Sequence, residues 1–334
     1  MSRLFTLFGI VIVPILLITL INSPWLNGVT TSSLILMIMV VGLYLFSGNS
    51  GVLAFGHVAF VAIGAYACGI LTIPAKVKPA IFPNLPYVLA HTTISPQAGV
   101  LVGGLVAAVA AAILFYPLRR LNAQALSIVT LALLLIANIF FTNVRLSSSG
   151  GSVFRVPLVA SMWTVTPWLL AAILIAFLFQ RSRMGLRLRA SREDEFAAES
   201  GGIDIGWTRL VAFAVSAAIM GVAGGLYALS IGSFSAADFF IDLTILLFAM
   251  MVVGGMRSLS GAIIGTAVIS IVSNVFSKLQ NGVTFGDFAF RFPSGSANVS
   301  IALCMIVVLL FRSEGLMRDL EINVADLWSR FKGK

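Results

Sequence analysis

Long apolar runs, separated by short polar gaps, cover almost the whole chain. Only 10% of the 334 residues are charged, while 59% are hydrophobic. A soluble domain carries roughly 25% charged residues, because its surface faces water. A chain this poor in charge needs lipid as its solvent, and lipid admits only a backbone that satisfies its own hydrogen bonds. We therefore expect an all-α, polytopic bundle of transmembrane helices.

The apolar runs predict about ten spans, each approaching the ~20 residues that cross a bilayer. They are the ranges 4–20, 33–46, 51–73, 99–116, 125–141, 164–178, 210–229, 240–255, 261–276 and 300–311. The second, sixth and eighth are short, so we expect them to extend into flanking residues. The first run has the length of a signal peptide, but no small-residue cleavage site follows it, so we expect a span there as well.

The basic residues predict the orientation of the spans. An even number of spans places both chain ends on one side. The gaps on that side hold fifteen Lys and Arg residues, and the opposite gaps hold six. Because positive loops stay in the cytoplasm, both termini are expected there. The basic residues fill gaps between spans and form no solvated patch, so the net charge of +9 does not indicate nucleic acid.

One cytoplasmic gap, about residues 180–208, is far longer and more charged than the others. Ser191 can cap a helix there, and Asp194 three residues on completes a capping-box pattern. Acidic residues fill the first turn and glycines follow the last: Glu193, Asp194, Glu195, Gly201 and Gly202. We expect a cytoplasmic helix of about three turns over residues 193–202, since 3.6 residues make one turn.

Two interpretations of this helix remain open. It can be an amphipathic loop helix that rests on anionic lipid, which would explain the arginines. It can also dock into another protein. Lipid headgroups repel an acidic triplet, and small residues such as Ala197 and Ala198 let a partner's backbone approach. The pattern therefore favours docking.

Four segments together resemble one family. They are residues 189–203, 47–67, 213–228 and 252–268, and their order and spacing match over most of the chain. They resemble the M-type permease subunit of the high-affinity branched-chain amino acid ABC transporters. The resemblance implies a single permease domain over 1–334, with a coupling loop at 180–208 and a short cytoplasmic tail at 312–334, in the bacterial inner membrane.

The resemblance also implies partners and a function. Such permeases work with a related second permease, two cytoplasmic ABC ATPase subunits and a periplasmic substrate-binding protein, and they carry leucine, isoleucine, valine or similar amino acids. The residues that would enter an ATPase groove are Arg192, Glu193, Asp194, Glu195, Ala197, Ala198 and Gly202. The outer loop 147–157 matches the family only loosely, so the substrate stays open.

The sequence is consistent with a transport subunit that does not bind ATP itself and depends on a partner for energy. The chain has no G-x-x-x-x-G-K-[ST] loop to bind phosphates, so we expect ATP and magnesium on partner subunits and no catalysis in this chain. Buried carboxylates that could relay protons are missing from the predicted spans, which counts against a proton-coupled carrier. A sodium-coupled secondary transporter remains the alternative, since backbone carbonyls can bind its ion.

Glycine-rich segments mark candidate path and packing residues. The densest one gives the translocation-path candidates Ser47, Gly48, Gly51, Gly56, His57 and Gly64. Such glycines indicate either a broken helix that lines the path or close helix packing. His57 either forms a hydrogen bond between helices or lines the path.

Two further glycine pairs and the cysteines are expected to pack. Gly221 and Gly225, like Gly261 and Gly265, are four residues apart, a spacing that allows tight helix contact. Cys68 and Cys304 lie inside apolar runs and are expected to be small packed side chains. We expect no metal site, because His57 and His91 are the only histidines.

Overall fold

A computed structural model describes residues 2–21, 23–82, 85–143, 152–280, 283–285, 288–290, 293, 295–312 and 314–317. The main helices are α1 (Ser2–Ile21), α2 (Pro24–Leu43), α3 (His57–Thr72), α6 (Pro96–Phe115), α7 (Ala123–Asn143), α8 (Met162–Arg181), α11 (Ile205–Ile231), α12 (Ile241–Gly254), α13 (Leu259–Gln280) and α14 (Ser296–Phe311). A π-helix, η1 (Tyr44–Gly48), continues α2.

Shorter elements connect the main helices. They are α4 (Lys78–Ile81), α5 (Tyr87–His91), the 3-10 helices η2 (Pro117–Arg120) and η3 (Ala236–Phe239), α9 (Arg183–Glu193), α10 (Glu195–Ser200) and the antiparallel pair β1 (Val283–Phe285) and β2 (Phe288–Phe290). In that pair, Val283 lies opposite Phe290. The architecture is the predicted helical bundle, and each of the ten predicted spans overlaps one main helix.

The lengths of these helices differ. Within the described residues, seven helical segments are long and apolar enough to cross a membrane, and three shorter apolar helices accompany them, at 6–21, 57–72 and 296–311. The short second span extends as expected, over 24–48. The third span begins later than predicted, because residues 51–54 are not helical and Gly51 has a φ of +73°.

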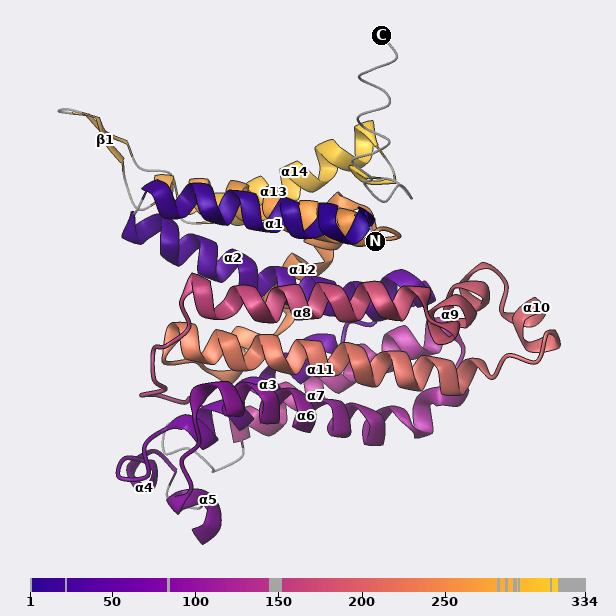
Figure 1. The fold of residues 1–334 in the computed structure, drawn as a ribbon, viewed down its shortest axis with the longest axis horizontal. Coiled ribbons are helices and arrows are strands. Elements are labelled where there is room, and N and C mark those ends of the chain that lie inside the picture. Colours follow the sequence, from indigo (N-terminus) through magenta and orange to yellow (C-terminus); the bar gives the residue numbers. More distant parts are fainter. Residues whose placement is uncertain are drawn as a thin grey trace.

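Helix α11 lies at the centre of the packing and contacts α2, α3 and α6 (Figure 1). Glycine brings these helices together. A Cβ added at Gly64 of α3 would lie 2.1 Å from the carbonyl oxygen of Gly221 in α11. A Cβ added at Gly103 of α6 would lie 2.8 Å from the carbonyl oxygen of Gly64. Backbone therefore meets backbone where the three helices cross.

The outward faces of the bundle remain apolar. Large side chains such as Leu105, Ile128 and Leu303 are 65%, 71% and 62% exposed. Contiguous exposed apolar surface of this kind needs lipid or a protein partner to cover it. The faces agree with helices that span a membrane.

The two ends of the bundle carry different structures (Figure 1). The N-terminus, α9 and α10 lie at one end, on the right of the view, and α4, α5 and β1 lie at the other. In the loop that holds α4 and α5, Lys78 is fully buried, and its ammonium group donates to the carbonyls of Leu89, at 3.1 Å, and Thr92. Burial lowers the pKa of Lys78 below its ordinary value. These hydrogen bonds hold α4 and α5 next to each other.

Candidate functional site

The predicted cytoplasmic helix is present, but it is shorter than expected and has a different cap. Asp194 caps α10, and its carboxylate accepts a hydrogen bond from the backbone N–H of Ala197 at 3.0 Å. Ser191 is not the cap, because it lies buried inside the preceding helix α9 and its hydroxyl donates to the Leu188 carbonyl. Asp194 takes an extended backbone, and this divides the charged stretch into two helices.

Helix α10 therefore has six residues in place of the expected three turns. The predicted glycine stop is confirmed. Gly201 follows the last helical residue, and Gly202 has a φ of +78°, a conformation that favours glycine. Ala198 points inward and is 7% exposed, whereas Ala197 is exposed. The other face of α10 is thus exposed in the part of the chain that the structure describes.

An exposed phenylalanine and an ion pair define the orientation of α10. The side chain of Phe196 is 84% exposed, although it lies in the most charged stretch of the chain. At the start of the same helix, Glu195 forms an ion pair with Arg209 of α11, whose side chain is 3% exposed. Arg209 Nε has no hydrogen-bond partner in the structure. The ion pair fixes α10 to the central helix and leaves Phe196 pointing outward.

Arg192 connects this region to the end of α2. Its Nη1 donates to the carbonyl of Gly48 at 2.9 Å, and its Nη2 forms an ion pair with Glu193 at 2.8 Å. The hydrogen bonds that Arg192 donates to the Glu193 carboxylate, together with its charge, hold the pKa of Glu193 below its ordinary range, and the charge of Arg257 adds a smaller effect in the same direction. The guanidinium of Arg192 thus links the charged connection that holds α9 and α10 to the segment after α2, where the helix is broken.

The helix break itself begins with the π-helix η1. The side chain of Asn49 donates to the Leu45 carbonyl at 3.0 Å, and the Tyr44 hydroxyl donates to Gln180 of α8 at 3.0 Å. After it, Gly51 has a positive φ, and a Cβ there would lie 2.6 Å from Cγ of Arg192. Short π-helical segments occur frequently at functional sites. Because Gly51 has no side chain, the side chain of Arg192 can pack directly against its backbone.

A second glycine-rich break meets the first. A Cβ added at Gly48 would lie 2.7 Å from the carbonyl oxygen of Met256, in the turn between α12 and α13. In that turn, Gly255 has a φ of +115°. Two helix breaks that are far apart in the sequence thus touch through their backbones.

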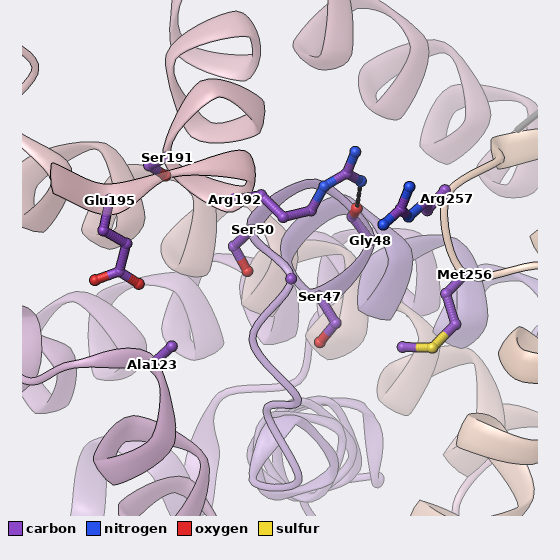
Figure 2. Close-up of a pocket in the computed structure, with 10 residues that line it drawn as sticks. Ser47, Gly48, Ser50, Ala123, Ser191, Arg192, Glu195, Met256 and Arg257 are labelled. Atoms are coloured by element: carbon purple, nitrogen blue, oxygen red, sulfur yellow. Dashed lines mark hydrogen bonds between the residues drawn. The ribbon is translucent and has the colours of Figure 1, made fainter. Parts of the chain in front are cut away.

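A pocket of about 340 Å³ lies where these parts come together (Figure 2). It is lined by Ser47, Gly48, Ser50 and Gly51 of the first break, Ser191, Arg192 and Glu195 of α9 and α10, Met256 and Arg257 of the second break, and Ala123. We call it the arginine pocket. Its volume is at the lower end of the range for sites that hold small molecules.

The pocket separates the path candidates into two groups. Ser47, Gly48 and Gly51 line it. Gly56 and Gly64 instead lie at helix contacts, since a Cβ at Gly56 would be 2.3 Å from the Thr130 carbonyl oxygen. Close helix packing is thus observed for Gly56 and Gly64, whereas a place of Ser47, Gly48 and Gly51 on the translocation path stays a prediction.

His57 lies in neither group. Its ring is 1% exposed and packs among aromatic rings, with centroids 4.6 Å from Phe213 and 5.3 Å from Phe46. Nδ1 lies 3.1 Å from the carbonyl oxygen of Ala54, and Nε2 has no hydrogen-bond partner among the described residues. The hydrogen bond that the structure describes is thus local to the break and does not join two helices.

The four packing glycines lie at helix contacts within this chain. Gly221 and Gly225 face α6, where a Cβ would lie 2.5 Å from Ala107 Cβ and 3.2 Å from Val100 Cα. Gly261 and Gly265 face α12, where a Cβ would lie 2.7 Å from the Gly254 carbonyl oxygen and 2.1 Å from that of Met250. Contact through glycine allows α11 and α13 to approach their neighbours backbone to backbone.

The sequence did not reveal several residues of this region. Arg209 and Arg257 are two basic residues of polar gaps, and their contacts with Glu195 and with the first break could not be predicted because they depend on folding. Phe196 carried a readable signal, as a large apolar residue within a charged gap. Residues 147–151 of the outer loop and 318–334 of the tail lie outside the described part of the chain.

Fold and site together define a polytopic membrane protein that holds a short capped helix outside its bundle. Comparison with known proteins then identifies the family. Residues 26–311 match the family model described as branched-chain amino acid transport system, permease component. Because the match covers most of the chain, the protein belongs to this family and is a permease component of a transport system.

Individual relatives agree with the family assignment. The high-affinity branched-chain amino acid transport system permease protein LivM of Salmonella typhimurium is 29% identical, over 86% of this chain and 69% of the relative. The LivM protein of Escherichia coli is 28% identical over the same shares. A probable LivH permease of Methanocaldococcus jannaschii is 34% identical over 42% of each chain. No solved structure matches significantly.

Proposed function

We propose that this chain is the membrane-spanning subunit of an ATP-driven importer that carries branched-chain or similar apolar amino acids into the cytoplasm of a bacterium. The family and the names of its relatives support this substrate class. In this proposal the chain is not an enzyme, and ATP with magnesium binds to separate ATPase subunits. Both termini face the cytoplasm, on the side of α9 and α10.

The single observation that carries the coupling role is the exposed Phe196 on a helix that is fixed in place. A six-residue helix that buried nothing would be marginal by itself, because helix nucleation is costly. The Asp194 cap and the ion pair between Glu195 and Arg209 stabilise it in one orientation. An aromatic side chain that is held rigidly and left exposed is typical of an interface anchor. We therefore place α10 in a groove of an ATPase subunit.

This arrangement also gives a mechanism. Movement of the docked α10 is transmitted through Arg209 to α11 and through Arg192 to the Gly48 carbonyl at the first helix break. A break in a helix is a point at which the two halves can tilt relative to each other. ATP-driven closure of the partner subunits would thereby switch the bundle between its outward and inward arrangements.

The proposal also gives positions for the remaining partners. A second, related permease would cover part of the exposed apolar faces, and lipid would cover the rest. A periplasmic substrate-binding protein would dock at the opposite end, where Lys78 holds α4 and α5 together. No part of the proposal involves nucleic acid.

A variant at Phe196 tests the coupling role. Phe196→Ala removes an 84% exposed ring, so we expect normal membrane insertion and thermal stability. Leucine uptake in cells that express the complete transporter should fall by about tenfold or more, and less ATPase should co-purify. The matched control is Phe311→Ala, which removes an 85% exposed ring at the end of α14 and should leave uptake unchanged.

Two results would contradict the proposal. Wild-type uptake and co-purification in Phe196→Ala would exclude α10 as the docking element. Uptake that survives ATP depletion but stops when ion gradients are collapsed would support an ion-coupled secondary transporter instead.

A further inference from the structure

The arginine pocket has the composition of a site for a small zwitterion. Arg192 and Arg257 bring two guanidinium groups to one side of it, near the Gly48 carbonyl, and Glu195 lies on the other side (Figure 2). Arg192 is already bonded to Gly48 and Glu193, but a guanidinium has five N–H donors and these contacts use only some of them. The lining thus holds two arginines and one glutamate, Glu195, whose carboxylate also pairs with Arg209.

Hydroxyl groups add further donors to the pocket. Ser47 and Ser50 are 1% and 3% exposed. Their oxygens accept hydrogen bonds from the backbone N–H groups of Ala54, at 3.4 Å, and Val52, at 3.2 Å. A serine hydroxyl also has one donor besides its acceptor sites, so each of the two can donate to a ligand that supplies an acceptor oxygen.

The rest of the lining suits an apolar side chain. Met256 extends its thioether into the space beside Ser47, and Ala123 forms the wall opposite the second break (Figure 2). Methionine adapts its shape to different apolar groups. A carboxylate, an ammonium group and an aliphatic chain on one small molecule would thus each find a matching surface.

We propose that the arginine pocket is an exit site, which binds the transported amino acid by its α-carboxylate before release to the cytoplasm. Arg192 and Arg257 receive the carboxylate together with the hydroxyls of Ser47 and Ser50, and Glu195 faces the ammonium group. This proposal rests on the proposed function for its substrate class. The site lies between α10 and both helix breaks, so a bound amino acid connects the element that the ATPase moves with the segments that open.

A binding measurement on the complete transporter in lipid nanodiscs tests the exit site. The samples contain neither ATP nor the periplasmic binding protein, and calorimetry compares leucine with leucinamide, which lacks the carboxylate, and with 4-methylpentanoate, which lacks the ammonium group. We expect leucinamide to bind at least about tenfold more weakly than leucine, since a charge-assisted hydrogen bond is lost. The carboxylate analogue should retain measurable binding.

Two variants make the assignment specific. Arg257→Gln changes an exposed side chain and should weaken leucine binding by about tenfold or more, while Ser47→Ala should weaken it by a smaller factor. The matched control is Arg187→Gln, an exposed arginine of α9 outside the pocket, and it should bind leucine as the wild type does. Equal binding of leucine and leucinamide, or wild-type affinity in Arg257→Gln, would overturn the exit site.

A parallel uptake assay separates this proposal from the proposed function. The wild-type transporter with its binding protein is reconstituted with ATP, and uptake of labelled leucine, isoleucine and valine is measured. Absence of uptake of any of them would overturn the proposed function. Normal uptake combined with equal binding of leucine and leucinamide would overturn the exit site alone.

Discussion

The crossing of α3, α6 and α11 and the connection formed by α9 and α10 are stabilised in opposite ways. At the crossing, backbone meets backbone through Gly64, Gly103 and Gly221, and charged side chains take no part. In the connection, charged groups position a helix that buries almost nothing. The crossing has no space for a side chain larger than glycine. The connection is held by a few hydrogen bonds and ion pairs that can be removed one at a time.

The difference follows from the two environments. In a membrane, all apolar side chains are equally compatible with lipid, so helices associate through close packing of small residues. Outside the membrane, water competes for every hydrogen bond, so an exposed ion pair contributes little unless one partner is buried. The side chain of Arg209 is only 3% exposed, so its ion pair with Glu195 is the interaction that stabilises the connection most.

The largest effect is expected from filling the glycine crossing. In Gly64→Val, the new Cβ would lie 2.1 Å from the Gly221 carbonyl oxygen, and backbone cannot move aside as a side chain can. We expect a loss of about 3 kcal/mol or more in the free energy of unfolding, and little folded protein in gel filtration.

The control for this variant is Gly28→Val, because nothing lies within 4 Å of a Cβ at Gly28. Normal yield and stability of Gly64→Val would show that the crossing is looser than its distances indicate.

A smaller effect is expected from neutralising Glu195. Glu195→Gln leaves the Arg209 guanidinium buried without a charged partner, which we expect to cost about 1–3 kcal/mol of stability, and α10 to lose its fixed orientation. Leucine uptake should fall by about tenfold, whereas thermal unfolding should shift by only a few degrees.

The double variant that adds Arg209→Met should recover part of the stability, because no buried charge is then left unpaired. It should not recover uptake. Recovery of both, or of neither, would contradict the separate roles that we assign to the ion pair and to the orientation of α10.

Arg192→Gln tests the link between the connection and the first helix break. It removes the hydrogen bond to the Gly48 carbonyl at 2.9 Å and leaves α10 and its cap intact. We expect ATP hydrolysis by the purified complex to continue while uptake falls by about threefold to tenfold. Hydrolysis and uptake that decrease in parallel would indicate that Arg192 acts on assembly of the complex and not on transmission.

The smallest effect is expected from pH. Interaction with Arg192 lowers the pKa of Glu193 in the folded protein, so ionised Glu193 favours the fold. This contribution is present above the ordinary pKa of glutamate and is lost as the pH falls through the lower folded value. Unfolding temperature measured on the acid side of glutamate's ordinary range should fall slightly more steeply in the wild type than in Glu193→Gln. Identical slopes would show that the pair adds nothing.

Much of the bundle could be predicted because hydropathy is a local property. Each predicted span overlaps a helix, although the third begins later than predicted, and Gly201 and Gly202 end α10 as their sequence indicates. The predicted cap residue, Ser191, was wrong, and the reason is also local. Ser191 and Asp194 both suit a cap, and the continuation of α9 through Ser191 left that role to Asp194.

By itself, the sequence determined the fold class, the position of the helices along the chain and the family, since these depend on composition, periodicity and contiguous motifs. Only the tertiary structure decided that Gly48 touches Met256, that Arg209 pairs with Glu195, and that three of the six path candidates line a pocket while the others do not. Hydropathy cannot separate a face that meets lipid from one that meets another helix, because both are apolar. Contacts between distant segments arise only when the packed bundle brings them together.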